Sequence, residues 1–143
     1  MNKDNSFNTE MMVLSHLVKH PTDYPNIKKE FFHRKDTQGI FEYIRKCKEP
    51  VTMNELAITE LAEPDLIKAI YRVDVNNPNE WVNQLIKFSI IREAPAHIVS
   101  KFTKNVDDEE VLTDWYKEAS VEEILNKIRE EEYKLRKEQD DFI

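Results

Sequence analysis

The chain has 143 residues, of which 40% are hydrophobic, 34% are charged and one is glycine. This length fits one domain with a buried core, and a hydrophobic fraction this high excludes a disordered chain. A single glycine cannot supply a glycine-rich phosphate loop and disfavours glycine-dependent hairpin turns, so the composition predicts an all-α fold. The sequence has no run of about 18 apolar residues and no secretory signal at its polar start, so we expect a cytoplasmic protein without a membrane span.

Charge is distributed unevenly along the chain. The formal net charge is −7, and residues 106–143 contain 14 Asp or Glu residues against 6 Lys or Arg residues, a balance of −8. The first 105 residues are therefore nearly neutral, whereas the acidic end disfavours a nucleic-acid backbone and indicates a protein partner. We divide the chain into a helical head with the first arm of a hairpin, residues 1–104, and an acidic helical tail, residues 105–143, with the second arm and a linker.

The first three predicted helices are placed by capping residues and apolar spacing. The first begins at residues 8–9 and ends before Pro21, which cannot continue a helix. A short segment follows at residues 25–29. The third helix is capped by Asp36 and contains Gly39, which costs about 1 kcal/mol relative to Ala inside a helix. We expect a close backbone contact to explain this glycine.

Proline and capping patterns place the next three helix starts. Thr52 and Glu55 have the spacing of a capping box, which predicts the start of a fourth helix. Pro64 fits the first turn of a fifth helix. After a polar break, Asn77 and Pro78 fit the cap and the first turn of a sixth helix.

The sixth predicted helix, residues 79–93, is apolar around most of its circumference. At 100° per residue its apolar side chains cover roughly 260°, whereas the stripe of a surface helix covers about 100°. This breadth predicts that the helix is covered on two sides. Pro95 is expected to kink or divide it, and a continuation is expected to carry Phe102 and to end at Lys104.

The acidic tail is expected to contain two further helices. A short one begins at residues 107–108. Ser120 and Glu123 form a second capping box, so the last helix begins near Val121. Its apolar positions form only a thin stripe: Ile124, Leu125, Ile128 and Leu135. Beyond Glu131 this helix should be solvated unless a partner covers it.

No pattern in the sequence indicates catalysis, a metal or another cofactor. Neither a Walker phosphate loop nor a dinucleotide-binding turn can be built from one glycine. His16 and His20 have the i,i+4 spacing of two zinc ligands, but no third ligand lies nearby, which favours a surface pair. Cys47 has basic neighbours but no nucleophile signature, which favours a structural cysteine. We therefore expect no enzyme activity.

A basic cluster between Lys28 and Lys48 is interleaved with aromatic residues, as in proteins that bind single-stranded nucleic acid. Phe41, however, lies on the same predicted helix face as Ile44, so the aromatic side chains are better explained as core. We expect direct nucleic-acid binding to be weak or absent.

Four segments of the chain occur in an order that a known family also has. They read EMMVLSHLVKHP, IKKEFFHRKDTQGIFEYIRK, EPVTMNELAITEL and WVNQLIKFSIIRE. The second contains an Ile-Phe pair, Ile40 and Phe41, and the third contains a Pro-Val step, Pro50 and Val51, before a capped helix. Over about residues 9–130 this ordered set resembles the N-terminal domain of DnaB-family replicative DNA helicases.

The resemblance implies a multi-helix head followed by a helical hairpin, through which family members dimerise and build the collar of a hexameric ring. It also implies that the head receives primase or a helicase loader. The ATPase core of such helicases is missing, so we expect either a truncated helicase or a free-standing relative, and a phage origin fits. The expected partner interface consists of Trp81, Leu85, Phe88, Ile91, Ile98, Phe102, Trp115, Leu125 and Ile128.

Three alternatives remain open from the sequence. The C-terminal, helicase-binding domain of bacterial primase resembles the same fold. A free-standing adaptor or inhibitor could mimic the head and bind a replicative helicase or primase. A nucleic-acid-binding module could use the basic cluster, which the nearly neutral head disfavours.

Overall fold

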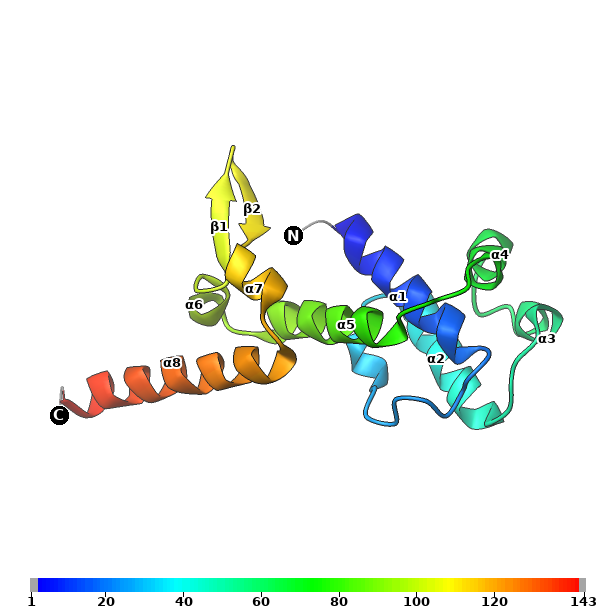
Figure 1. Ribbon diagram of the computed structural model, residues 1–143, viewed down its shortest axis with the longest axis horizontal. Helices are drawn as coiled ribbons and strands as arrows, with labels where there is room; N and C mark the ends of the chain where they lie inside the picture. Colours follow the sequence, from blue (N-terminus) through cyan, green and yellow to red (C-terminus); the bar gives the residue numbers. More distant parts are fainter. Residues whose placement is uncertain (1–2, 142–143) are drawn as a thin grey trace. The chain divides into compact units, whose positions relative to one another are not determined.

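The computed structural model describes residues 3–141 and divides the chain into two compact units (Figure 1). One unit ends at Ser89 and the other begins at Ile90, so the boundary lies inside helix α5 (Pro78–Glu93). The sequence-based division at residue 104 rests on charge, whereas this division rests on contacts. The described part of the chain is mainly helical and contains one two-stranded sheet. The predicted all-α class is therefore confirmed in its helical character, but the prediction did not include this β-hairpin.

The N-terminal unit is built from short helices around one core. Its elements are α1 (Lys3–Leu17), the 3-10 turn η1 (Lys29–Phe31), α2 (Lys35–Cys47), α3 (Met53–Ile58), α4 (Pro64–Arg72) and the first part of α5. Helix α1 packs against α2 and α4, and α3 packs against α4. Helix α1 begins earlier than the expected residues 8–9, because Thr9 and Glu10 are buried side chains of the helix rather than its cap.

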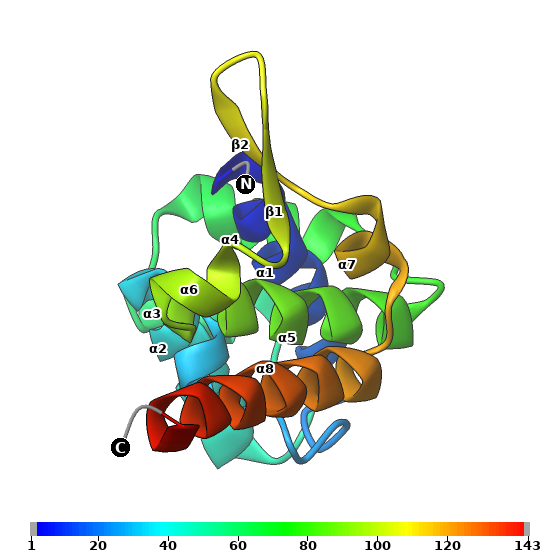
Figure 2. The ribbon, with the colours of Figure 1, turned by 90° about the vertical axis from the view of Figure 1, so that its left-hand side faces the viewer.

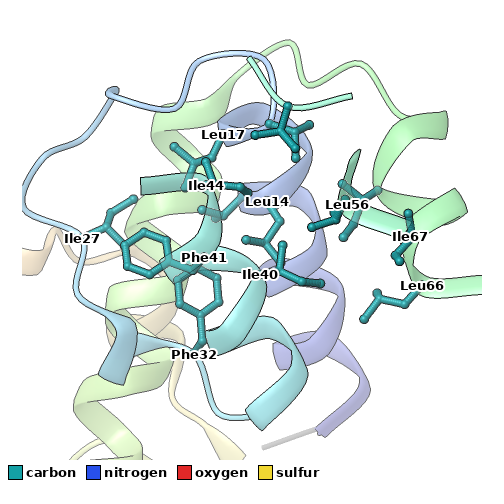
Figure 3. Close-up of a cluster of buried hydrophobic side chains, with 14 of the residues drawn as sticks. Leu14, Leu17, Ile27, Phe32, Ile40, Phe41, Ile44, Leu56, Leu66 and Ile67 are labelled. Atoms are coloured by element: carbon teal, nitrogen blue, oxygen red, sulfur yellow. The ribbon is translucent and has the colours of Figure 1, made fainter. Parts of the chain in front are cut away.

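The core of this unit confirms the helix face that Phe41 and Ile44 were predicted to share (Figure 3). Leu14 and Leu17 of α1 meet Ile40 and Ile44 of α2, and all four are fully buried. The rings of Phe32 and Phe41 stack with their centroids 5.0 Å apart. These two aromatic side chains are 1% and 5% exposed, so they are core residues and not part of a nucleic-acid-binding surface.

Gly39 has a different neighbour from the expected backbone contact. A Cβ atom at this position would lie 3.3 Å from Cδ2 of Leu61, which follows α3. The expectation of a close backbone approach was therefore wrong, since the close group is a side chain. Local sequence could not show this, because it depends on how the segment after α3 folds over α2.

The predictions at Thr52, Pro64, Pro78 and Ser120 are confirmed, but Asp36 is not the cap of its helix: α2 begins at Lys35, its N-cap is Arg34 without a side-chain hydrogen bond, and Asp36 lies in the first turn. The Thr52 hydroxyl accepts a hydrogen bond from the Glu55 amide at 3.2 Å, and helices α4 and α5 begin at Pro64 and Pro78. In the C-terminal unit the box at Ser120 is complete: the Ser120 hydroxyl accepts from the Glu123 amide, and the Glu123 carboxylate accepts from the Ser120 amide, both at 3.1 Å.

The C-terminal unit contains the end of α5 and a hairpin between short helices. Its elements are α6 (Ala96–Val99), β1 (Thr103–Val106), β2 (Glu109–Leu112), α7 (Asp114–Glu118) and α8 (Val121–Asp141). Figure 2 shows the two strands as a narrow hairpin that projects from α6 and α7. Its core consists of Ile91, Ile98, Phe102, Tyr116, Ala119 and Ile124.

The hairpin corrects two predictions. Helix α6 ends at Val99, so the expected continuation to Lys104 is wrong, and residues 107–108 form a turn instead of starting a helix. Both aspartates of this turn have positive φ, 52° and 65°, as a two-residue hairpin turn requires. Asp tolerates this conformation better than most residues with a side chain, so the hairpin forms without glycine.

Candidate interaction surface

The structure places four of the nine predicted interface side chains inside the chain's own cores. Leu85 is 1% exposed in the N-terminal unit, and Ile91, Ile98 and Phe102 are at most 7% exposed in the C-terminal unit. In the folded chain a partner cannot reach them. We therefore remove these four from the candidate surface.

Helix α5 is apolar around most of its circumference because it contributes side chains to the cores of both units. Val82 and Leu85, near its start, belong to the core of the N-terminal unit, whereas Ile91, near its end, belongs to the core of the C-terminal unit. The two-sided coverage predicted from the sequence is therefore supplied by the chain itself. It gives no independent support for a dimer contact at this helix.

The other five predicted residues retain some exposure. Trp81, Phe88 and Ile128 are partly exposed, and Trp81 and Ile128 also pack against the core of their own unit. Trp115 is 44% exposed and Leu125 is 39% exposed. The accessible part of the predicted interface therefore lies mostly on α7 and α8.

Trp115 lies on α7, which begins where the Thr113 hydroxyl accepts a hydrogen bond from the Tyr116 amide at 3.3 Å. The indole stacks on Phe102 with centroids 5.9 Å apart and an interplanar angle of 11°. One side of the indole is therefore held by the core, and the remainder faces solvent. A rigid, half-exposed tryptophan is a common centre of a protein–protein contact.

Helix α8 is buried only along its first turns. Ile124 is fully buried and Ile128 is half-buried, whereas every residue from Glu132 to Asp141 is exposed. The exposed part includes Tyr133, 69% exposed, and Leu135, 39% exposed. In Figure 1 this outer half of α8 extends away from α6 and α7 of its own unit.

The middle of α8 carries a cluster of ion pairs centred on Glu131. Its carboxylate lies 3.5 Å from Lys127, 3.7 Å from Lys134 and 3.9 Å from Lys101, which lies in the turn after α6. Partial desolvation raises the pKa of the Glu131 carboxyl, but the three lysines outweigh it and hold this pKa below its ordinary value. The cluster joins α8 to its own unit at the point where apolar packing ends.

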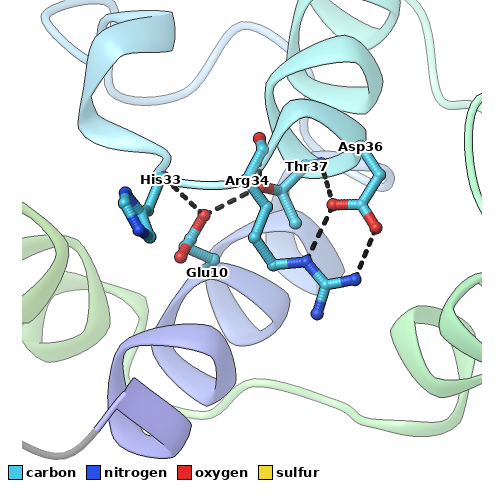
Figure 4. A network of polar contacts seen from close by, with 5 residues as sticks. All are labelled: Glu10, His33, Arg34, Asp36 and Thr37. Atoms are coloured by element: carbon cyan, nitrogen blue, oxygen red, sulfur yellow. Dashed lines mark hydrogen bonds and ion pairs between the residues drawn. The ribbon is translucent and has the colours of Figure 1, made fainter.

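A buried polar network in the N-terminal unit is a second candidate site (Figure 4). Glu10 is 1% exposed, and its Oε1 accepts hydrogen bonds from the His33 amide at 2.8 Å and the Thr37 hydroxyl at 2.7 Å. Arg34 forms a bidentate pair with Asp36, at 2.7 and 3.1 Å. These groups surround the N-terminus of α2, where the helix dipole favours a carboxylate. The network joins α1 to α2, which indicates a structural role.

Sequence reasoning missed Glu10 because it assigns acidic side chains to helix surfaces. Its partners lie 23 and 27 residues away, and one of them is a backbone amide. The only local signal is that an acidic residue comes directly before the apolar run of the first helix.

The histidine pair and the cysteine show no metal-site geometry. The rings of His16 and His20 stack with centroids 4.7 Å apart, and Nε2 of His16 lies 2.9 Å from the Asp23 carboxylate. Among residues 3–141, no group of three or more His, Cys, Asp or Glu side chains is arranged to hold a metal ion. Cys47 is half-buried, and its hydrogen bond to Tyr43 raises the pKa of that phenol.

Comparison with protein-family models, curated proteins and solved structures finds no match to this chain. The resemblance to the helicase N-terminal domain therefore rests on the four sequence segments. Over the described residues, no helix combines the length and the apolarity that a membrane span needs.

Proposed function

We propose that this chain is a non-catalytic protein-interaction and oligomerisation domain of DNA replication, resembling the N-terminal collar of a replicative helicase. Its partners are further copies of itself and a primase, helicase or helicase loader in the cytoplasm. The single observation that carries the proposal is the outer half of α8, which is helical but has no cover from its own unit.

The outer half of α8 gains little stability from its own unit. The ten residues from Glu132 to Asp141 extend a helix that is nucleated by its packed first turns, so only helix propagation, and no packing, holds them. The apolar side chains among them remain exposed to water. Contact with another chain would bury these side chains and stabilise the helix.

The charge of the C-terminal end supports a protein as this partner. Helix α8 contains eight acidic and five basic residues, so a phosphate backbone is repelled, whereas a protein surface can match both signs. Trp115 provides a second exposed anchor in the same unit. Both features fit a surface for proteins.

Native mass determination of the full chain, alone and mixed with a replicative helicase or a primase, tests the proposal. We expect either a concentration-dependent oligomer or a complex with one of these proteins. A species that stays monomeric at high concentration and binds neither protein would refute it.

The non-catalytic part of the proposal is tested separately. We expect the purified chain to show no magnesium-dependent ATP turnover, because no phosphate loop can be assembled from its residues. Turnover that follows the protein through two independent purifications would contradict this part alone.

A further inference from the structure

Helix α8 carries a second, regular pattern beside the face that packs on its own unit. Its members alternate steps of four and three residues, the heptad spacing of a coiled coil. They are Val121, Leu125, Ile128, Glu132, Leu135 and Gln139. In the sequence the spacing continues to Phe142. We call these six described positions the α8 seam.

The exposure of the α8 seam follows its position along the helix. Val121 and Ile128 are partly covered by their own unit, Leu125 and Leu135 are each 39% exposed, and Glu132 and Gln139 are exposed. The seam is thus continuous with the packed face in the first turns and free in the outer half. A helix of 21 residues is about 31 Å long and provides three heptads.

We propose that the α8 seam pairs with the same seam of a second copy, as a parallel, in-register two-stranded coiled coil. This inference rests on the proposed function, because it names the occupant of the surface described there. Val121, Ile128 and Leu135 take the d positions, and Leu125, Glu132 and Gln139 take the a positions.

The charges that flank the α8 seam select the parallel orientation. In a parallel pair, each g position faces the e position five residues later in the other copy, which sets Glu131 against Arg136 in both directions. In an antiparallel pair, g positions face g positions and e positions face e positions. Full overlap then sets Glu131 against Glu131 and Arg129 against Arg129, and only Arg136 finds an opposite charge, at Glu122. The Glu131 side chain is 14% exposed and already lies 3.5–3.9 Å from three lysines of its own chain, so Arg136 of the second copy adds a further ion pair at the exposed edge of this carboxylate.

The polar a positions make this pairing weak. Glu132 faces its own copy in a parallel pair, so two carboxylates meet at the seam and their repulsion reduces affinity. Replacing this residue by leucine should tighten the dimer about tenfold, and Leu135→Gln should weaken it by a similar factor. Tyr133 is more exposed than Leu135 but lies at a b position, on the opposite side, so Tyr133→Gln is the matched control and should change affinity less than twofold.

Orientation is tested by cysteine cross-linking of the full chain with Cys47→Ser as background. Gln139→Cys places a thiol at a seam position, and Lys137→Cys places one at an outward f position two residues earlier. Both sites are exposed, so neither change disturbs a core. Under mild oxidation we expect Gln139→Cys to form a disulfide-linked dimer and Lys137→Cys to form at least about fivefold less, with circular dichroism confirming that both variants are folded.

The outcomes separate this inference from the proposed function. A dimer in sedimentation whose Gln139→Cys form does not cross-link more than the Lys137→Cys form would overturn the parallel seam, while the proposed oligomerisation would stand. A monomer that binds helicase or primase would refute the claim that a second copy pairs with the α8 seam, and would again leave the proposed function intact. A monomer that binds neither would refute both.

Discussion

Replacing Gly39 by alanine sets a gain in helix propensity against a close contact. Gly39 lies in the interior of α2 and its φ is not positive, so alanine can adopt the same backbone conformation. In a helix interior this change is worth about 0.8–1.0 kcal/mol, because the unfolded chain loses conformational freedom. The cost depends on Leu61, whose Cδ2 would lie 3.3 Å from the new methyl group and must move by a few tenths of an ångström.

Leu61 is able to make this movement. Its side chain is 37% exposed, and the contacting atom is the end of a flexible side chain. Partial loss of a few contacts of about 0.1–0.2 kcal/mol each leaves most of the propensity gain. We therefore expect Gly39→Ala to raise the free energy of unfolding by about 0.5–1 kcal/mol and the melting temperature by about 2–4 °C.

Urea unfolding followed by circular dichroism measures this change, and a double-mutant cycle with Leu61→Ala isolates the contact. If Leu61 moves aside, the two substitutions are additive within about 0.3 kcal/mol. The reasoning is refuted if Gly39→Ala destabilises the protein and Leu61→Ala restores the loss, because Leu61 would then be held rigidly over α2. An unchanged m-value shows that the substitution leaves the surface exposed on unfolding unchanged.

Three further substitutions probe other parts of the chain. Trp115→Ala should cost about 1–2 kcal/mol in thermal unfolding, because the indole is half-exposed but stacks on Phe102; a loss below about 0.3 kcal/mol would show that this stacking contributes nothing. Asp108→Gly should raise the free energy of unfolding by up to about 1 kcal/mol, because glycine adopts the positive φ of this β-hairpin position without the steric cost that aspartate has. A lower free energy of unfolding would contradict this explanation of the turn. Burial, then the charges of nearby groups, raise the pKa of Tyr71 to about 12, so its contribution is complete below pH 10, the ordinary tyrosine value, and is lost as the pH rises toward 12. Tyr71→Phe should cost about 1 kcal/mol at neutral pH, through the lost 2.5 Å hydrogen bond to the Val51 carbonyl, and should reduce the alkaline loss in urea titrations; an unchanged alkaline slope would assign that loss to other groups.

The helices of the N-terminal unit could be predicted because their signals are local. Thr52, Pro64 and Pro78 each mark a helix start through groups within one turn, and the apolar spacing of α2 selects its buried face. The hairpin had no such signal. Its strands have four residues each and are mostly polar, and its turn contains two aspartates where glycine or asparagine is the usual mark.

Interactions between distant segments explain what else was missed. Glu10 is buried because the His33 amide and the Thr37 hydroxyl reach it from beyond α1, and Gly39 is close to Leu61 because the segment after α3 folds over α2. Neither contact has a periodic signature. A side chain's type predicts its preferred environment, but only the folded chain determines which partners are present.

The broad apolar surface of α5 shows why a sequence pattern alone cannot identify a partner interface. Apolar side chains lose the same contact with water whether their own chain or another chain covers them, so both arrangements produce the same periodicity. The chain itself buries the apolar side chains of α5: Leu85 lies in the core of one unit and Ile91 in the core of the other. An interface must therefore be sought among apolar residues that remain exposed after both cores are complete. In the C-terminal unit that criterion moves the candidate surface from α5 to Trp115 of α7 and to Leu125 and Leu135 of α8.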